Sequence, residues 1–314
     1  MNTEFVIQSS EAESMAQSLN LPSVIHLLPH LVQSAQSLAR PSISNFHVAA
    51  VGLGSDGRVF IGVNLEFPGV PLHHSVHAEQ FLLTNLAVNN CPRLLYLAVS
   101  AAPCGHCRQF FQELRHSSSL QILITNPDQK VNFDFNPLSQ ILPNPFGPHD
   151  LLDQEHPLLL EEHNNGLDLL PYNDDHNHDL NKLGNGYCKK YDFDETLLKN
   201  SALEAANNSH SPYSGCPSGI ALMDCEGKVY KGSYVESAAY NPSLGPVQAA
   251  LVAYVAGGGG GYERIVAVVL VEKEESKVRQ EDTARLLLKA VSPKCEFRVY
   301  FCDSIENGSL KIAG

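Results

Sequence analysis

Long apolar runs and basic residues are scarce in this 314-residue sequence. No apolar run approaches the roughly 18 residues of a membrane-spanning helix, so we expect no membrane association. The first residues, MNTEFVIQSSEAES, contain neither a basic nor an apolar region, so no secretory signal is visible and we expect a cytoplasmic protein. The 21 Lys and Arg against 34 Asp and Glu give a formal net charge of −13, which disfavours a nucleic-acid partner when no strong basic patch is evident.

Disulfide frameworks are typical of shorter secreted chains, so the eight cysteines favour metal binding or free thiols. A hydrophobic fraction of 43% is ordinary for a globular protein and is sufficient for a sizeable core. The length is large for one domain and comfortable for two. These bulk properties indicate a globular protein of two domains with unpaired cysteines.

Residues 22–125 alternate helical and strand patterns. Helices separate several of the strands, so we expect parallel neighbours in the sheet. The expected elements are a helix over 27–38, two strands on either side of a turn at 55–57, a helix over 77–87, a strand over 93–101, a helix over 104–114 and a strand over 120–126.

Residues 151–195, here called the connecting segment, are rich in Asn, Asp, His and Pro and poor in periodic pattern. We interpret them as a polar linker with little regular structure. Its histidines, His163, His176 and His178, lack accompanying cysteines and regular spacing, so we assign them to a solvated segment rather than to a metal cluster. The glycine run at 257–261 predicts a second flexible loop.

The order of elements expected in residues 22–125 repeats in residues 196–314, and a shift of 170 residues aligns the two regions around their paired strands. The stretch SDGRVFIGVNLEF then lies over CEGKVYKGSYVES without a gap. The identical pairs are Ser44 and Ser214, Gly57 and Gly227, Val59 and Val229, Gly62 and Gly232, and Glu66 and Glu236. We infer two copies of one fold, a first copy within residues 1–150 and a second copy within residues 196–314.

The two copies differ most in one group of polar residues. At the same shift His77 aligns with Val247 and Glu79 with Ala249, and the second copy has no Cys-x-x-Cys. A fold that forms without this group does not need it for folding, so we expect His77 and Glu79 to carry chemistry. The first copy is therefore predicted to be the catalytic domain and the second a degenerate, non-catalytic one.

His77, Cys104 and Cys107 form a candidate metal site. The two cysteines stand at the expected start of a helix, where unpaired N–H groups and the helix dipole favour thiolates. Their spacing of three puts both sulfurs on one side, whereas His106 between them points elsewhere. Three protein ligands with one open position are typical of a catalytic zinc, because a structural zinc site takes four. A redox pair would instead call for a thioredoxin-like context without a separate His-x-Glu.

The strings His77-Ala78-Glu79 and Pro103-Cys104-Gly105-His106-Cys107 match the H-x-E and P-C-x-x-C signature of zinc nucleobase deaminases. In that chemistry zinc lowers the pKa of a bound water to about 7, and the zinc-bound hydroxide attacks C4 of the cytosine ring. Glu79 is not a ligand in this scheme. We expect it to carry the proton of the water to N3 and then a proton to the leaving amine, since one carboxylate can lie beside both groups.

These motifs resemble the cytidine deaminases of nucleoside salvage, in particular the two-domain homodimeric class. The resemblance rests on SNFHVAAVG, VNLEFPG, VHAEQ, PCGHCRQF, LPNPFGPHDL, SPYSGCPSGIAL and AAYNPSLGPVQAAL. It implies an α/β fold of two tandem copies, each a mixed β-sheet of about five strands flanked by helices in α/β/α layers. It also implies a homodimer, one zinc per chain, and hydrolytic deamination of cytidine and 2′-deoxycytidine to uridine and 2′-deoxyuridine in pyrimidine salvage.

The resemblance further implies which residues bind the substrate. It assigns the ribose to Asn64 and Glu66, the pyrimidine face to Phe46, the base carbonyl to the N–H of Ala78, and a place in the active site of the other subunit to Phe146. Core packing is the alternative role for the two phenylalanines. The copy of Glu66 at Glu236 leaves a structural role open for one of the two glutamates.

Two other functions stay open on the sequence. A deaminase of polynucleotides or nucleotides would need a basic groove or a phosphate clamp, and the acidic net charge argues against both. A catalytically inactive, dimer-forming relative is the third hypothesis, because the second copy shows that this fold can lose its site. The first copy, however, keeps every residue that the chemistry requires.

Overall fold

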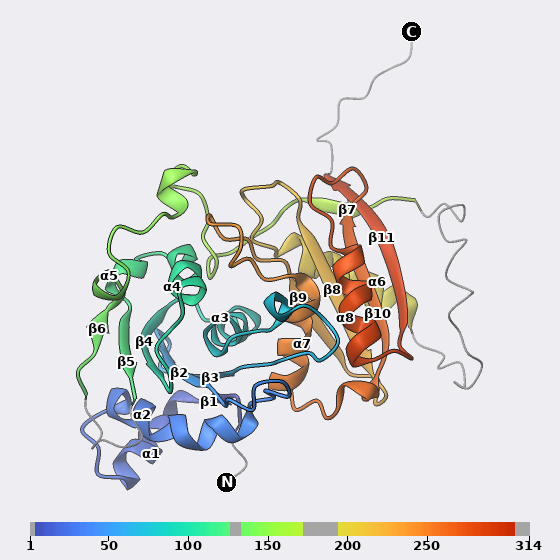
Figure 1. The fold of residues 1–314 in the computed structure, drawn as a ribbon. Coiled ribbons are helices and arrows are strands. Elements are labelled where there is room, and N and C mark those ends of the chain that lie inside the picture. Colours follow the sequence, from blue (N-terminus) through green and yellow to red (C-terminus); the bar gives the residue numbers. More distant parts are fainter. Residues whose placement is uncertain (1–3, 126–132, 172–193, 305–314) are drawn as a thin grey trace.

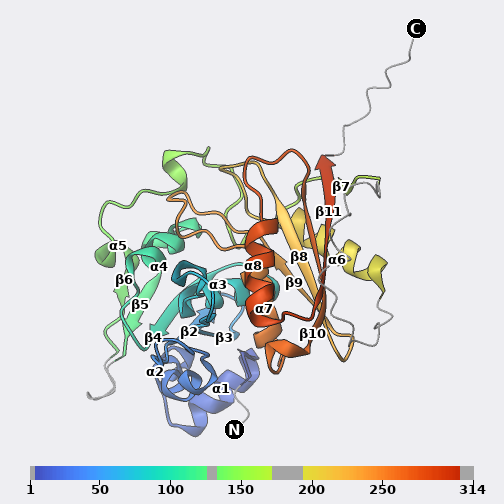
Figure 2. The same cartoon turned by 45° about the vertical axis from the view of Figure 1, so that its right-hand side comes forward.

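A computed structural model describes residues 4–125, 133–171 and 194–304, and Figure 1 shows two α/β units side by side. Helices α3 (Ala78–Val88) and α7 (Pro246–Ala256) pack against each other between the two sheets (Figures 1 and 2). His176 and His178 lie outside the described residues. No helix within the described ranges is long and apolar enough to cross a membrane.

The first copy is built on a six-stranded mixed sheet with the order β1-β3-β2-β4-β5-β6. Strands β4 and β5 are parallel, and the other neighbouring strands are antiparallel. Helix α2 packs against β2 and β4, and α3 packs against β3 and β2 from the opposite face (Figure 1). The elements are β1 (Val6–Ile7), α1 (Ser9–Ser18), α2 (Val24–Ala35), β2 (Ala49–Gly54), β3 (Val59–Val63), α3, β4 (Leu94–Val99), α4 (Gly105–Phe110), β5 (Gln121–Ile124), β6 (Asn136–Pro137) and α5 (Leu138–Ile141).

The second copy repeats this arrangement. Its sheet has the order β7-β11-β10-β8-β9, in which β9-β8-β10-β11 corresponds to β3-β2-β4-β5, and its only parallel pair among the described strands is β10 with β11. The expected α/β fold of two tandem copies with mixed sheets is therefore confirmed. The elements are β7 (Leu167–Leu169), α6 (Glu195–Asn207), β8 (Ser218–Asp224), β9 (Val229–Ser233), α7, β10 (Ile265–Lys273), α8 (Glu281–Val291) and β11 (Glu296–Ser304).

The connecting segment is more ordered than its composition indicates. Strand β7 comes from this segment and pairs antiparallel with β11, and Leu158 and Leu159 are buried. The ring of His163 lies 5.2 Å from the ring of His210, and its Nε2 lies 3.2 Å from the carbonyl oxygen of Leu158. The expectation of a solvated His163 is thus wrong, because the few leucines of the segment anchor it to both copies.

Gly62 and Gly232 explain why the glycine of β3 recurs in β9. A Cβ at Gly62 would lie 2.2 Å from the carbonyl oxygen of Ala78, and one at Gly232 would lie 2.3 Å from that of Pro246. Only glycine therefore lets the first turn of α3, or of α7, sit directly on the neighbouring strand. In the first copy this close approach places the start of α3 over the sheet.

The constant shift of 170 residues fails at one loop. Leu65 pairs with Val76, and Val235 pairs with Leu244, so the loop after Glu236 is two residues shorter than the loop after Glu66. Helix α3 begins after His77 and α7 begins after Gly245. The counterparts of His77 and Glu79 are therefore Gly245 and Val247, and the alignment with Val247 and Ala249 was wrong, since a gapless count cannot detect a shortened loop.

A carboxylate of the first copy is buried in the second. Glu113, in the 3₁₀ turn η3 (Phe111–Glu113), is 0% exposed. It accepts hydrogen bonds from the hydroxyl of Tyr213 at 2.7 Å and the N–H of Ala238 at 2.7 Å, and Nε2 of His210 lies 3.1 Å from it. A single apolar cluster also contains residues of both copies. The two copies are therefore one folded body.

The glycine run 257–261 is held in place by side-chain hydrogen bonds to its carbonyl oxygens. Lys228 Nζ donates to the carbonyl oxygen of Gly257, Arg40 donates to those of Gly259 and Gly260, and the hydroxyl of Tyr254 donates to that of Gly261. The expectation of a flexible loop did not take these hydrogen bonds into account. Because glycine has no side chain, its carbonyl groups are easily reached by side chains of other segments.

Candidate active site and metal centre

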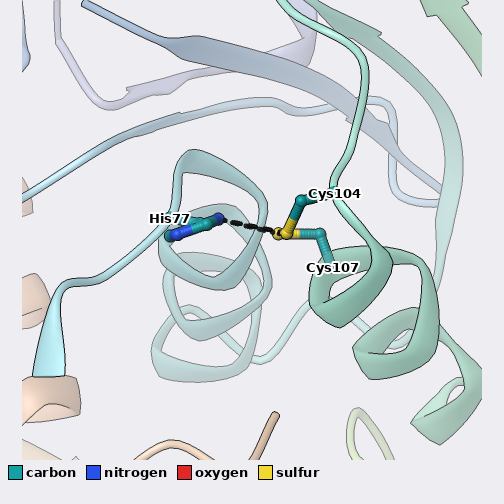
Figure 3. A group of neighbouring side chains, drawn as sticks. All are labelled: His77, Cys104 and Cys107. Atoms are coloured by element: carbon teal, nitrogen blue, oxygen red, sulfur yellow. Dashed lines mark hydrogen bonds between the residues drawn. The ribbon is translucent and has the colours of Figure 1, made fainter. Parts of the chain in front are cut away.

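Two helix starts bring the three candidate ligands together. His77 is the residue before α3, Cys104 is the residue before α4, and Cys107 lies in the first turn of α4. The N–H groups of a first helical turn have no partner within the helix, and they favour anionic groups such as thiolates. Figure 3 shows the imidazole of His77 pointing at both sulfurs across the gap between the helices.

The distances between the donor atoms fit one zinc ion. Nδ1 of His77 lies 3.5 Å from the sulfur of Cys104 and 3.4 Å from that of Cys107, and the two sulfurs are 3.7 Å apart. A tetrahedral zinc with ordinary bond lengths separates two sulfurs by about 3.8 Å and a sulfur from a nitrogen by about 3.6 Å. The triangle matches those separations. His106 is not part of the cluster, in agreement with its expected direction.

The charges around the triangle call for a cation. Hydrogen bonds with Cys107 and His77 lower the pKa of Cys104 to about 3. The pKa of Cys107 is raised by its hydrogen bond to Cys104 and by burial, and burial raises the pKa of Glu79. The hydrogen bond with Cys104 raises the pKa of His77. Two thiolates beside a third acid are unfavourable by themselves, so a divalent cation is the partner that lets both thiols ionise.

Glu79 lies in the first turn of α3, two residues after His77, and is only 4% exposed. It is not one of the residues whose donor atoms form the metal cluster. A buried carboxyl group with a raised pKa holds a proton more readily than an exposed one, which suits a group that accepts and returns protons.

A cavity of about 320 Å³ opens beside the triangle. It brings Asn64 and Glu66 to the same space as His77, and His77 and Cys104 are exposed whereas Cys107 is buried, so one side of the triangle stays accessible. The lining residues are Ile43, Ser44, Asn64, Glu66, Leu72, Ser75, Val76 and His77.

Glu66 also builds the wall of this cavity. Its carboxylate accepts hydrogen bonds from the N–H groups of Ile43 and Ser44, both at 2.8 Å, and from the hydroxyl of Ser44 at 2.6 Å. Burial opposes the charge, but these bonds from Ser44 and Ile43 lower the pKa of Glu66. Three bonds leave room on the carboxylate for a further donor, such as a ligand hydroxyl.

Asn64 has a structural role that the sequence did not reveal. Its side-chain amide donates to the carbonyl oxygen of Phe46 and accepts from the N–H of Val48, both at 2.9 Å. The amide therefore fixes the entry to β2, and one N–H of the amide stays available for a ligand.

The two candidate phenylalanines lie outside the wall of the cavity. Phe46 is 61% exposed and Phe146 is 47% exposed, and neither is among the described residues that line the space. Core packing, the alternative role, does not fit such exposure. The carbonyl oxygen of Phe146 accepts a hydrogen bond from Gln109 of α4. Ala78 is the first residue of α3, so its N–H belongs to the unpaired helix start.

Gln80 links the site to the second copy, and sequence reasoning missed this role. Its side-chain oxygen accepts from the N–H of His77 at 3.3 Å, and its side-chain nitrogen donates to the carbonyl oxygen of Pro242 at 2.9 Å. The sequence does contain a hint of this role, because a glutamine recurs at this position in the second copy. Gln248 aligns with Gln80 once the loop before it is known to be two residues shorter.

A duplicated α/β fold with a His-Cys-Cys centre beside a buried glutamate defines a zinc-dependent deaminase. Family models described as the cytidine and deoxycytidylate deaminase zinc-binding region match residues 23–121 and 138–285. Cytidine deaminase 1 of Arabidopsis thaliana is 59% identical over 306 residues, which cover 95% of this chain and 97% of the relative. The chain therefore belongs to the cytidine deaminase family, and zinc is its metal.

A second relative agrees with this assignment. Cytidine deaminase 6 of Arabidopsis thaliana is 49% identical over 88% of this chain and 91% of the relative. The crystal structure of a cytidine deaminase from Mycobacterium tuberculosis is 31% identical with a TM-score of 0.33, and the match covers 38% of this chain and 95% of that one.

Proposed function

We propose that this protein hydrolyses cytidine and 2′-deoxycytidine to uridine and 2′-deoxyuridine with release of ammonia. The observation that carries the proposal is the triangle of His77 Nδ1 and the two sulfurs, with separations of 3.4, 3.5 and 3.7 Å, next to a buried Glu79. The relatives named cytidine deaminase support the nucleoside as substrate.

The residues divide the reaction between them. His77, Cys104 and Cys107 would hold zinc, which when bound supplies Lewis-acid activation of water as the nucleophile. Glu79 takes a proton from the water and gives one to N3 of the ring. The new C–O bond forms at C4. Glu79 then takes the remaining proton of the former water from the C4 hydroxyl and passes it to the exocyclic amine. The C4–N bond breaks as the C4 carbonyl forms, and ammonia is released.

The remaining residues bind and orient the nucleoside. The N–H of Ala78 at the start of α3 donates to the carbonyl oxygen of the base, and Phe46 covers the face of the ring. The free position on the carboxylate of Glu66 accepts a hydrogen bond from the 3′-hydroxyl, and the remaining N–H of Asn64 contacts the same sugar. Recognition through the 3′-hydroxyl is compatible with both ribose and 2′-deoxyribose.

The lining of the cavity supports a nucleoside rather than a nucleotide or a polynucleotide. Among the described residues that line it there is no Lys or Arg, and the carboxylate of Glu66 faces the space. A phosphate group would therefore find a negative charge and no cationic clamp.

We also propose that residues 1–150 are the catalytic domain, that residues 196–314 are non-catalytic, and that two chains form a homodimer. The exposed ring of Phe146 would then reach the active site of the other subunit. Mixing inactive Glu79→Ala chains with Phe146→Ala chains tests this: mixed dimers would regain activity, whereas a monomer in sedimentation or mixtures without recovery would refute the shared site.

A cytoplasmic location is proposed as well. The described cysteines are all unpaired, and thiols persist in reducing compartments. Fractionation of cells that express the protein tests this, and recovery in a secreted or organellar fraction would contradict it.

The central test combines a zinc measurement with an assay of four substrates. We expect one zinc per chain and a fall in absorbance with cytidine and with 2′-deoxycytidine, but little turnover of deoxycytidylate or single-stranded DNA. A folded, zinc-replete protein that is inactive on both nucleosides would refute the proposal. Preference for a phosphorylated substrate would instead support the nucleotide or polynucleotide hypothesis.

A further inference from the structure

The backbone of Arg40 pairs with a segment that lines the cavity, and its side chain contacts the second copy. Its N–H donates to the carbonyl oxygen of Asn64 at 2.9 Å, and its carbonyl oxygen accepts from the N–H of Glu66 at 3.1 Å. The backbone of Arg40 thereby pairs with Leu65, between the two residues assigned to the sugar. Here we call residues 64–66 the ribose loop.

The guanidinium of Arg40 reaches the glycine run of the second copy. Its two terminal nitrogens donate to the carbonyl oxygens of Gly260 and Gly259, both at 3.0 Å, and Cζ lies 5.0 Å from the ring centroid of Tyr262. A planar guanidinium that bonds two acceptors and stacks on an aromatic ring is held more firmly than a Lys ammonium could be.

The receiving glycines are held in place by their own surroundings. A Cβ at Gly259 would lie 2.5 Å from the ring of Tyr254, so a larger residue would displace the loop. The N–H of Gly259 donates to the carbonyl oxygen of Tyr254 at 2.8 Å, and the hydroxyl of Tyr254 donates to that of Gly261 at 2.8 Å. The carbonyl groups that face Arg40 are therefore fixed acceptors.

The second copy has the same backbone arrangement at His210, which stands 170 residues after Arg40. The N–H of His210 donates to the carbonyl oxygen of Tyr234, and its carbonyl oxygen accepts from Glu236. Its side chain turns to Glu113 of the first copy. In each copy, the residue that pairs with the loop around the glutamate, Glu66 or Glu236, thus contacts the opposite copy through its side chain. Of these two loops, the one in the first copy lines the cavity described above.

We propose that Arg40 is a positioning residue through which the non-catalytic copy fixes the ribose loop for the sugar hydroxyls. The inference rests on the proposed ribose-binding role of Glu66 and Asn64. Arg40 does not line the cavity and is not one of the candidate metal ligands. Loss of its anchor should therefore weaken the hydroxyl contact, which raises KM, and leave the chemical step at C4 almost unchanged.

The test compares cytidine with 2′,3′-dideoxycytidine, which lacks the 2′- and 3′-hydroxyls of the sugar and keeps the 5′-hydroxyl. For Arg40→Met we expect KM for cytidine to rise about tenfold, with kcat changed by less than about threefold, since hydrogen bonds of a charged group are lost. KM for the dideoxy substrate should change by less than about twofold. Arg40→Lys should recover part of the loss. Gly259→Ala should reproduce the substrate-selective effect from the second copy, with its larger strain monitored by Tm.

Two further variants make the outcome decisive. Lys228→Met removes a different side-chain bond to the glycine run, at Gly257, and should leave KM for both substrates unchanged. Glu66→Gln should lose affinity for cytidine only. If Glu66→Gln is selective but Arg40→Met is not, or raises KM for both substrates equally, the role of Arg40 is overturned. If Glu66→Gln is itself unselective, the ribose assignment fails, and the inference fails with it.

Discussion

The first and second copies share a loop held by a glutamate but differ in the candidate metal ligands beside it. Glu66 accepts from Ile43 and Ser44, and Glu236 accepts in the same way from Tyr213 and Ser214. The second copy keeps this carboxylate although no metal-ligand cluster is found among its described residues. The glutamate is therefore part of the scaffold in both copies, and the proposed role in substrate binding would be an addition in the first.

The second copy has other residues at the positions of the candidate site. Gly245 stands where His77 precedes α3, and Gln280 stands where Cys104 precedes α4. Tyr234 occupies the place of Asn64 and is only 7% exposed, and burial raises the pKa of its hydroxyl. A glycine, an amide and a buried phenol thus stand where the first copy has two candidate metal ligands and Asn64.

The largest expected effect is that of Cys107→Ser, which removes a candidate metal ligand of the first copy. We expect zinc to fall from one per chain to almost none and activity to fall more than about 10³-fold, because a serine hydroxyl is a poor zinc ligand at neutral pH. The matched control is Cys225→Ser in the second copy, an exposed thiol outside the cluster. Elemental analysis and a cytidine assay measure both, and a second zinc per chain in the unaltered protein would break the comparison.

Glu79→Ala should separate catalysis from metal binding. We expect kcat to fall about 10² to 10⁴-fold, the range for loss of a general acid–base group, with zinc content unchanged. The counterpart of Glu79 is the buried Val247, so Val247→Ala serves as the control, with turnover within about twofold of the parent. Unchanged turnover in Glu79→Ala would refute the proton-transfer role.

Glu113→Ala should test how firmly the copies depend on each other. The change leaves the donors from Tyr213, His210 and Ala238 without an acceptor, so we expect a loss of about 3 kcal/mol in the free energy of unfolding. Glu204→Ala, which removes an exposed pair with Lys231, should cost less than about 1 kcal/mol. Urea unfolding measures both, and equal losses would contradict a special role for the buried carboxylate.

The smallest expected effect is a change in the acid sensitivity of Tm when His163 is replaced by Asn. Burial, followed by the nearby His210 and His156, lowers its pKa to about 4, while Glu161 acts in the opposite direction. The unfolded chain binds this proton near pH 6.5, so the contribution of neutral His163 is complete above that pH and is lost as the pH falls toward 4. Tm should therefore fall less between pH 7 and pH 5 in His163→Asn than in the parent, and identical falls would exclude this residue as a cause.

Much of the fold was predictable from local pattern. The strand pair around Gly57, the helix after His77 and the repeat in the second copy each depend on periodicity or on a turn residue, and each is present. The metal triangle was predictable as well, since its three ligands come from two short motifs that each begin a helix.

Pairings between distant segments were not predictable. Strands β1 and β6 have two residues each, which is too short for any period to show. The bonds of Glu113 and Arg40 cross between the copies, and nothing in the adjacent residues indicates their partners. The sequence comparison did not reveal the shorter loop after Glu236, because all the identical pairs up to Glu66 and Glu236 fit the same shift of 170 residues.

The burial of Glu113 has a consequence for attempts to reduce this protein to a minimal enzyme. The first copy contains every residue of the proposed chemistry. Without the second copy, however, the carboxylate of Glu113 would lose its hydrogen-bond donors, and the face of α3 that packs against α7 would be exposed to solvent. We therefore expect the first copy on its own to unfold or aggregate. The second copy would then be a permanent structural support for the copy proposed to be catalytic.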